Sequence, residues 1–250
     1  MRLKKKKMEI KKEDWQKRTR LLVKETGIEK LKNSTVAVIG VGGVGGYAAE
    51  MLVRSGVGHL IVLDVDTVNI TNKNRQILAL DSTLGRKKTD VIRDRLTDIN
   101  SELDLYVIDK YLTEENVKDI FSDMPKLDFL VDAIDTLSPK IALINYCVNN
   151  NISLVSSMGA GAKYDATKVR ISDLSKSYNC PLAYILRKKL RKIGISKGFN
   201  VVFSEELPDR DAIVPVENEA NKKSQVGTIS YLPAVFGCVC AQEVLRKLLK

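Results

Sequence analysis

The chain has 250 residues, and its hydrophobic fraction of 44% is enough for the core of one large domain or two small ones. Lys and Arg outnumber Asp and Glu by 41 to 31, and the net charge of +10 suits either an ordinary solvated surface or a polyanionic partner such as RNA. No apolar run has the length of a membrane span, and the basic N-terminus lacks the apolar stretch of a secretion signal. We therefore expect a cytoplasmic protein that does not bind a membrane.

Strands and helices alternate through the first part of the chain. Residues 1–14 form a basic arm, in which Asp14 is placed to cap a following helix. Runs of β-branched and apolar residues predict strands at residues 35–39, 60–64, 105–108, 128–134 and 153–157. Helical periodicity predicts helices after the first strand and at residues 87–100, 114–121 and 139–149. This alternation is typical of an α/β fold with a doubly wound, Rossmann-like, mostly parallel sheet.

The pattern changes beyond residue 157. A strand at residues 168–171 has no helix before it, which indicates that antiparallel strands extend the sheet. A helix, a strand, a long polar stretch and a final helix follow, at residues 181–193, 200–204, 205–228 and from about 233. Because no repeat or linker is visible, we predict a single domain over residues 15–250. Its nucleotide-binding half would cover about 33–157, and its substrate-facing half about 158–250.

A glycine-rich turn joins the first strand to its helix. Gly40, Gly42, Gly43 and Gly45 let a phosphate approach backbone N–H groups at the positive end of that helix. Asp64 ends the second strand, at the distance along the chain where such folds place the carboxylate that binds ribose. These residues predict a nucleotide site but do not distinguish a mononucleotide from a dinucleotide.

Further polar residues follow the second strand, at the sheet edge where ligands bind in open α/β folds. Asp66, Asn72, Arg75 and Gln76 form this cluster, and a nicotinamide dehydrogenase has no need for it. The planar guanidinium of Arg75 suits a phosphate. Lys88 begins a helix and therefore opposes the helix dipole, which a bound polyphosphate would compensate. A merely solvated Lys88 is the alternative.

Two carboxylates close the fourth predicted strand. Asp135 is suited to hold Mg²⁺ together with phosphate oxygens, while Asp132 either joins it or caps the next helix. With the glycine turn, Arg75, Lys88 and Asp135 would stabilise the charge that develops during displacement at phosphorus. We therefore predict a polyphosphate pocket with Mg²⁺, and these three residues as catalytic.

The cysteines and the histidine offer little chemistry. The four cysteines are Cys147, Cys180, Cys238 and Cys240, and none belongs to a C-x-x-C pair. Cys238 and Cys240 point to different faces of a helix and are interpreted as small buried residues, whereas Cys180, before a helix, is the better candidate for a reactive thiol. His59 alone cannot build a His-rich metal site.

Several motifs resemble the ThiF/MoeB/HesA family of E1-like enzymes, which activate a carboxylate with ATP. They are GVGGVG, LDVDTV, TNKNRQ, LGRKK and DAID, and the resemblance is close over about residues 15–157. It implies that Asp64 contacts ribose, that Asn72, Arg75 and Lys88 contact phosphates, and that Asp135 serves Mg²⁺. It also implies a homodimer in which Arg18 reaches the ATP of the partner.

The remainder resembles the tRNA threonylcarbamoyladenosine dehydratase branch of that family, in DAIDTLSPKIALINYC, ISLVSSMGAGAKYDATKVRISDLSKS and CPLAYILRKKLRK. This resemblance implies adenylation and then cyclisation of N6-threonylcarbamoyladenosine at position 37 of tRNA. It places residues 156–161, a glycine-rich turn, near the substrate. The predicted tRNA-binding residues are Arg187, Lys188, Lys189, Arg191 and Lys192.

Three alternatives remain. The first is an E1-like enzyme that adenylates the C-terminal glycine of a ubiquitin-like sulfur carrier, although such members usually hold zinc with two C-x-x-C pairs that this chain lacks. The second is a nicotinamide dehydrogenase, and the third is a non-catalytic nucleotide-binding RNA adaptor. The family also allows a sulfur-relay protein as a further partner.

Overall fold

The computed structural model describes residues 14–215 and 224–250, so the predicted basic arm at residues 1–14 lies almost wholly outside the described residues. The chain begins with a 3₁₀ turn, Asp14–Gln16, followed by helix α1 (Lys17–Lys32). Gln16, without a side-chain hydrogen bond, occupies the N-cap position of α1, and Asp14 lies in the preceding 3₁₀ turn. The backbone of Lys24 is left-handed (φ 64°), which kinks α1.

One seven-stranded sheet runs through the molecule in the order β3-β2-β1-β4-β5-β7-β6. The strands are β1 (Thr35–Ile39), β2 (His59–Leu63), β3 (Asp104–Ile108), β4 (Phe129–Asp132), β5 (Leu154–Ser157), β6 (Val169–Asp173) and β7 (Asn200–Ser204). All neighbouring pairs are parallel except β6 with β7. The predicted doubly wound sheet with an antiparallel extension is therefore confirmed, although only β6 runs against the others.

Both faces of this sheet are covered, as its sequence requires. Every residue of β1 is buried, with Val36 and Val38 in one apolar cluster and Ala37 and Ile39 in the other. Parallel strands that are buried on both faces have continuous apolar runs instead of alternating ones. The run TVAVI therefore forms the centre of the sheet.

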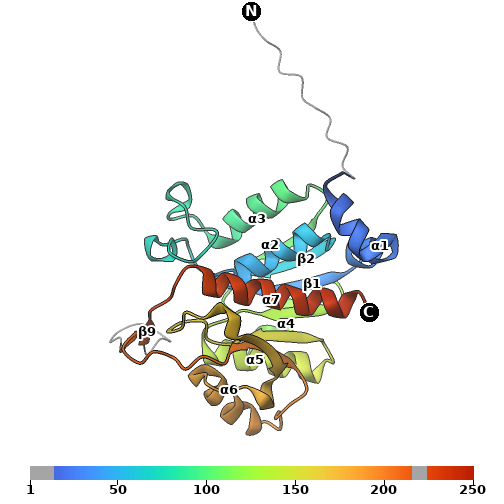
Figure 1. Cartoon of the computed structure of the whole chain (residues 1–250). Coiled ribbons are helices and arrows are strands. Elements are labelled where there is room, and N and C mark those ends of the chain that lie inside the picture. The colour runs from blue at the N-terminus through green and yellow to red at the C-terminus, as the bar shows by residue number, and fades with distance from the viewer. Residues whose placement is uncertain (1–13, 216–223) are drawn as a thin grey trace, which may run out of the picture.

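Helices form a layer on each side (Figure 1). One layer holds α2 (Gly45–Ser55), α3 (Lys88–Ile99) and α7 (Tyr231–Leu248), and the other holds α4 (Val117–Ser122), α5 (Leu137–Asn149) and α6 (Pro181–Arg191). Gly56, with φ 102°, ends α2 as the sequence predicts. The described residues contain no helix that combines the length and apolar character needed to span a bilayer.

Helix α7 lies beside α2, although the two are far apart in the chain (Figure 1). A Cβ atom on Gly237 would collide with the carbonyl oxygen of Val44 and would lie 2.8 Å from Cβ of Tyr47. The glycine therefore lets the helices touch at the first turn of α2. The buried stripe of α7 repeats every four residues and consists of Leu232, Phe236, Cys240 and Val244.

The polar stretch at residues 205–228 contains a hairpin that its composition does not predict. Strand β8 (Ile213–Pro215) pairs antiparallel with β9 (Ser224–Val226), apart from the main sheet. Gly227 donates its N–H to the carbonyl of Ala212, and Ala162 donates to the carbonyl of Gly227. The hairpin is therefore fastened to the chain that follows β5.

Candidate active site

The glycine turn lies at the carboxyl end of β1, between β2 on one side and β4 on the other. This is the point where strand order reverses and where open α/β sheets bind ligands. Gly40 has φ 86°, and a Cβ atom there would lie 3.0 Å from the carbonyl oxygen of Ala133. A Cβ atom on Gly45 would collide with the carbonyl oxygen of Gly40. These two glycines are therefore needed to close the turn itself.

The other two glycines face the polar loop that follows β2. A Cβ atom on Gly42 would lie 3.7 Å from Nε2 of Gln76, and one on Gly43 would lie 3.5 Å from Cγ of Arg75. The structure thus brings the glycine turn and the predicted polar cluster together. The motif divides into glycines that shape the backbone and glycines that face the loop.

Asp64 connects the end of β2 to the glycine turn. Its Oδ2 atom accepts a 2.7 Å hydrogen bond from the N–H of Val41, and its Oδ1 atom accepts a 2.9 Å bond from the N–H of Asp66. Asp64 is only 9% exposed. The carboxylate therefore shapes the site, and its predicted contact with ribose stays a prediction.

The loop with Asn72 and Arg75 is braced by its own hydrogen bonds. Oδ1 of Asn72 accepts from the N–H of Asn69 at 3.0 Å, which caps a short 3₁₀ turn. Nη1 of Arg75 donates to the carbonyl of Thr71 at 3.0 Å and to Oδ1 of Asn74 at 2.9 Å. Both acceptors are neutral, and a phosphate is a stronger acceptor than either. Arg75 is therefore suited to exchange them for a nucleotide phosphate.

Lys88 has a protein partner that the sequence does not reveal. Its Nζ atom lies 2.7 Å from Oδ2 of Asp66, and its backbone N–H donates to the carbonyl of Asp66. The Lys88 side chain is 6% exposed and that of Asp66 is 64% exposed. Asp66 therefore supplies a negative charge beside the lysine at the start of α3, and the contact of Lys88 with a polyphosphate stays a prediction.

Asp132 has neither of its two predicted roles. It is fully buried, and its Oδ2 atom lies 2.8 Å from Nζ of Lys140 and accepts a 2.6 Å hydrogen bond from Ser156. Lys140 also donates to the carbonyl of Ile134 at 2.8 Å. Strand β4 ends at Asp132, two residues before the predicted end at residue 134, so Asp135 lies in the turn that follows. Lys140 and Asp132 therefore hold the turn that carries Asp135.

Asp135 is exposed on that turn, beside the glycine loop that Ala133 contacts. Within residues 14–215 and 224–250, no group of three or more His, Cys, Asp or Glu side chains is arranged to hold a metal ion. One carboxylate fits Mg²⁺ when nucleotide phosphates and water supply the remaining ligands. Asp135 meets that requirement.

Comparison with known proteins identifies the family. The model of the ThiF family matches residues 16–250. The chain belongs to the ThiF family. It is 43% identical over 240 residues to the tRNA threonylcarbamoyladenosine dehydratase of Bacillus subtilis, covering 93% of this chain and 94% of that protein. It is also 31% identical over 154 residues to the molybdopterin-synthase adenylyltransferase of Escherichia coli, covering 62% of this chain and 61% of the relative.

A solved structure agrees with this assignment. The E. coli tRNA N6-threonylcarbamoyladenosine dehydratase TcdA, in complex with ATP, superimposes with a TM-score of 0.85 at 34% identity. The match covers 95% of this chain and 96% of that chain. This ThiF-family protein therefore has the E1-like fold along nearly its whole length.

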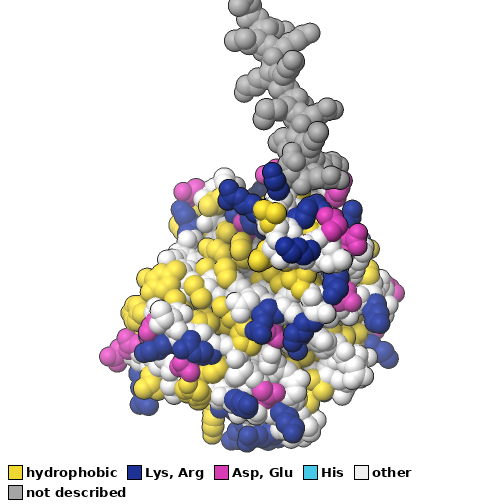
Figure 2. Space-filling view, turned by 45° about the vertical axis from the view of Figure 1, so that its right-hand side comes forward, with side chains coloured by type: hydrophobic (Ala, Val, Ile, Leu, Met, Phe, Trp, Pro, Cys, Tyr) yellow, Lys and Arg dark blue, Asp and Glu magenta, His cyan; other side chains and the backbone are white. Residues whose placement is uncertain are grey.

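Two predicted features of this ThiF-family protein lie away from the glycine turn. Arg18 is exposed on α1. Gln16, which precedes α1, lies beside Gly56, and Gly56 follows α2 at the end opposite to the glycine turn. Arg187 on α6 is half-buried and donates to the carbonyl of Ser177 at 2.7 Å. Lys188, Lys189, Arg191 and Lys192 are exposed. Figure 2 shows Lys and Arg in several separate groups on one face, without a continuous band.

The cysteines of this ThiF-family protein are mostly buried. Cys147 and Cys240 are fully buried, and burial raises the pKa of both thiols, which keeps them protonated. Cys238 is exposed, so its interpretation as a buried residue is wrong. Cys180 is buried too, and its Sγ atom lies 3.7 Å from the position of a Cβ atom on Gly159.

A buried lysine lies next to the glycine-rich turn that follows β5. Lys163 is 3% exposed and donates to the carbonyls of Asn179 and Ser204 at 3.0 and 2.9 Å. Burial lowers its pKa, although Cys180 and Glu206 act in the opposite direction. The sequence does not reveal that Lys140 and Lys163 are buried, because a lysine side chain is normally solvated.

Proposed function

We propose that this protein is an ATP-dependent tRNA threonylcarbamoyladenosine dehydratase. The proposal is carried by the 43% identity to the B. subtilis enzyme of that name along almost the whole of both chains. The likeness to TcdA in complex with ATP supports the nucleotide. The juxtaposition of the glycine turn with Gln76 and Arg75 supports the same cofactor from the geometry.

The site residues would have separate roles in binding ATP. Backbone N–H groups of residues 40–45 and the start of α2 bind phosphate oxygens, and Asp64 orients the ribose. Arg75 and Lys88 neutralise the phosphate charge, with Asp66 orienting Lys88, and Asn72 donates a hydrogen bond to a phosphate from its amide. Gln76, only 9% exposed, packs beside the glycine turn. Mg²⁺ on Asp135 would supply further positive charge to the phosphates.

The reaction would begin when a carboxylate oxygen of the threonyl group attacks the α-phosphorus of ATP. An oxygen–phosphorus bond forms to the carboxylate as the bond to pyrophosphate breaks. An atom of the neighbouring carbamoyl group then attacks the activated carbonyl carbon, closing a five-membered ring as AMP leaves and a proton is lost. The net change in the nucleoside is the loss of water, and ring closure gains from the proximity of its two ends.

We further propose that the tRNA contacts the exposed basic residues of α6. Lys188, Lys189, Arg191 and Lys192 are exposed, as phosphate contacts require, and the half-buried Arg187 is held by its bond to Ser177. The net charge of +10 favours a polyanionic substrate.

A homodimer is the assembly that best explains Arg18 and the exposed apolar residues beyond β2. Val65, Ile70, Leu80 and Leu84 have exposures of 46%, 66%, 52% and 37%. A second copy would cover them, and it would bring Arg18 to the partner's ATP rather than to its own site. A sulfur-relay partner and a cytoplasmic location stay predictions from the sequence alone.

Pyrophosphate release tests the proposed function. We expect release from ATP with tRNA that carries N6-threonylcarbamoyladenosine, and a loss of 18 mass units from the modified nucleoside by mass spectrometry, as expected for one water. Unmodified tRNA and a carrier protein ending in Gly-Gly serve as controls. Equal release with both tRNAs would exclude this substrate, and release with the carrier alone would favour the sulfur-carrier alternative.

A further inference from the structure

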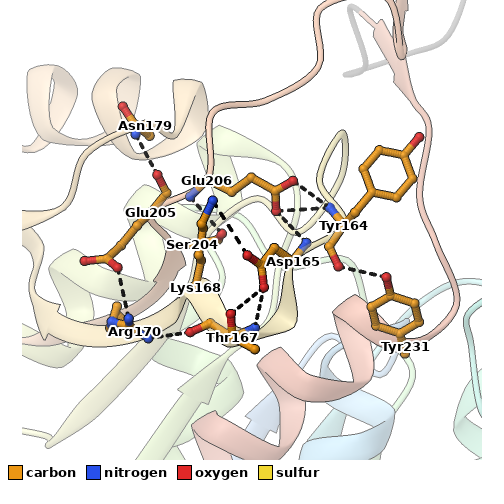
Figure 3. Close-up of polar contacts among 10 residues, drawn as sticks. All are labelled: Tyr164, Asp165, Thr167, Lys168, Arg170, Asn179, Ser204, Glu205, Glu206 and Tyr231. Carbon is orange, nitrogen blue, oxygen red and sulfur yellow. Dashed lines mark hydrogen bonds and ion pairs between the residues drawn. The ribbon is translucent and has the colours of Figure 1, made fainter.

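Two neighbouring tyrosines have solvent-exposed rings near the candidate active site. Tyr164 is 58% exposed and Tyr231 is 45% exposed. The hydroxyl of Tyr231 donates a 2.8 Å hydrogen bond to the backbone carbonyl of Tyr164. Figure 3 shows that the ring of Tyr164 points away from the polar contacts that surround its backbone.

The backbone of Tyr164 is held from the other side as well. The carboxylate of Glu206 accepts hydrogen bonds from the N–H of Tyr164, at 3.0 Å to each oxygen, and from the N–H of Asp165 at 2.7 Å. Both backbone polar groups of Tyr164 are therefore fixed while its side chain faces solvent (Figure 3). An exposed ring adds little to folding, but a backbone that is fixed in advance loses little entropy when the ring it carries is bound.

Short contacts connect this pair to the candidate ATP site. Tyr231 begins α7, and Cβ of Pro233 lies 3.2 Å from the position of a Cβ atom on Gly43. The carbonyl of Thr228 accepts a 3.0 Å hydrogen bond from Nδ2 of Asn74. Because Asn74 precedes Arg75, the segment that carries Tyr231 contacts both the glycine turn and the loop of Arg75 in the candidate ATP site.

The nearby carboxylates are engaged by the protein. Glu206 is bound by the two backbone N–H groups, and Glu205 pairs with Arg170 at 3.1 Å and accepts from the hydroxyl of Tyr178 at 2.5 Å. Lys168 lies 3.6 Å from Asp165. Asp165 and Glu205 are thus paired with cations, while Glu206 is bound only by neutral N–H groups and keeps its negative charge. An uncharged base therefore suits this surface better than a phosphodiester chain.

We propose that Tyr164 is a stacking platform for an unpaired base of the tRNA anticodon loop, next to the nucleoside that is modified, and that Tyr231 is a positioning residue that fixes it. This inference rests on the proposed function. Single-stranded loops are commonly recognised by stacking of bases on aromatic side chains, which tolerates different bases. Position 37 lies in such a loop, so its neighbouring bases are available to a ring near the candidate ATP site.

The test compares four variants by affinity for a fluorescently labelled anticodon stem-loop RNA and by steady-state kinetics with modified tRNA. We expect Tyr164→Ala to weaken RNA binding and raise the KM for tRNA about tenfold, with the KM for ATP unchanged. Tyr164→Phe keeps the ring and should behave as wild type. Tyr231→Phe keeps its ring but loses the bond to the Tyr164 carbonyl, so it should raise the KM for tRNA by about threefold.

Tyr111→Ala is the matched control, because Tyr111 is 44% exposed beyond the far edge strand β3. It should leave both RNA affinity and kinetics unchanged. Wild-type affinity of Tyr164→Ala for the stem-loop would overturn the inference, as would an equal loss in Tyr111→Ala. If Tyr164→Ala does not fold, judged by circular dichroism, a wild-type KM for tRNA in Tyr231→Phe would overturn the role of Tyr231.

The two proposals fail in different ways. Stem-loop binding needs no turnover, so loss of binding in Tyr164→Ala supports the platform even if wild-type protein releases no pyrophosphate with modified tRNA. That second result would instead contradict the proposed reaction. If wild-type protein turns over modified tRNA and Tyr164→Ala still binds the stem-loop normally, the platform is contradicted and the proposed reaction is not.

Discussion

Lys140 is a charged side chain with no exposure to solvent, and its ammonium group connects two parts of the site. It pairs with Asp132 and donates to the carbonyl of Ile134, next to Asp135. Ser156 from β5 completes the environment of the carboxylate. A buried ion pair contributes little net stability by itself, but losing one partner leaves the other charge without compensation.

We therefore expect Lys140→Met to lower the free energy of unfolding by about 3–5 kcal/mol, measured by urea denaturation. The matched control is Arg93→Met, which removes the exposed pair between Arg93 and Asp90 and should cost less than about 1 kcal/mol. The double variant Lys140→Met with Asp132→Leu should recover part of the loss. Equal effects of the two single variants would contradict this account.

The residues whose local geometry agrees with the sequence pattern are those that shape a single turn. The positions of Gly40 and Gly45 are predicted by the strand-to-helix turn, and that of Asp64 by its place at the end of β2. The pairs Asp66–Lys88 and Asp132–Lys140 join different elements of the fold. Their spacing carries no periodic signal, so only the tertiary structure reveals them.

Among the elements, α6 has the clearest division between a buried and a charged face. Ala183, Leu186 and Leu190 are buried, while Lys188 and Arg191 are exposed. If α6 contacts tRNA phosphates, neutralising both exposed cations should act on affinity through counterion release, not on chemistry.

We expect Lys188→Gln with Arg191→Gln to reduce the slope of log affinity against log salt by about two, and to raise the KM for tRNA without changing that for ATP. Lys118→Gln with Lys126→Gln is the control, because both lysines are exposed elsewhere, on α4 and in the loop after it. An unchanged salt slope in the α6 variant would exclude this helix from the tRNA interface.

The elements with continuous apolar or strongly periodic sequences were predicted well. Strand β1 has the predicted bounds, and α7 begins within two residues of its predicted start. The hairpin of β8 and β9 was missed because its strands are short, half exposed and include Pro215. Such strands are stabilised by contacts with the rest of the chain and carry no hydrophobic alternation of their own.

At the scale of the whole molecule, seven strands form a single sheet. The single domain over residues 15–250, with its nucleotide half and its substrate half, stays a prediction. In the proposed homodimer, each ATP site would be completed by Arg18 of the other copy.

Mixing two inactive variants tests that sharing of residues. We expect Arg18→Ala and Arg75→Ala each to lower the rate of pyrophosphate release about a hundredfold. An equal mixture, after subunit exchange, should recover about a quarter of wild-type activity, because half of the dimers are hybrids with one intact site each. No recovery in dimers that have exchanged, checked by native mass spectrometry, would mean that Arg18 does not act across the interface.

The packing of α7 on α2 also affects how the protein is made on the ribosome. The glycine turn and α2 emerge early, but Phe236, Cys240 and Val244, which cover the apolar face of this layer, follow all the strands of the sheet. Until α7 is synthesised, the nascent chain exposes that face to water. We therefore expect the growing polypeptide to be prone to aggregation until α7 covers that face.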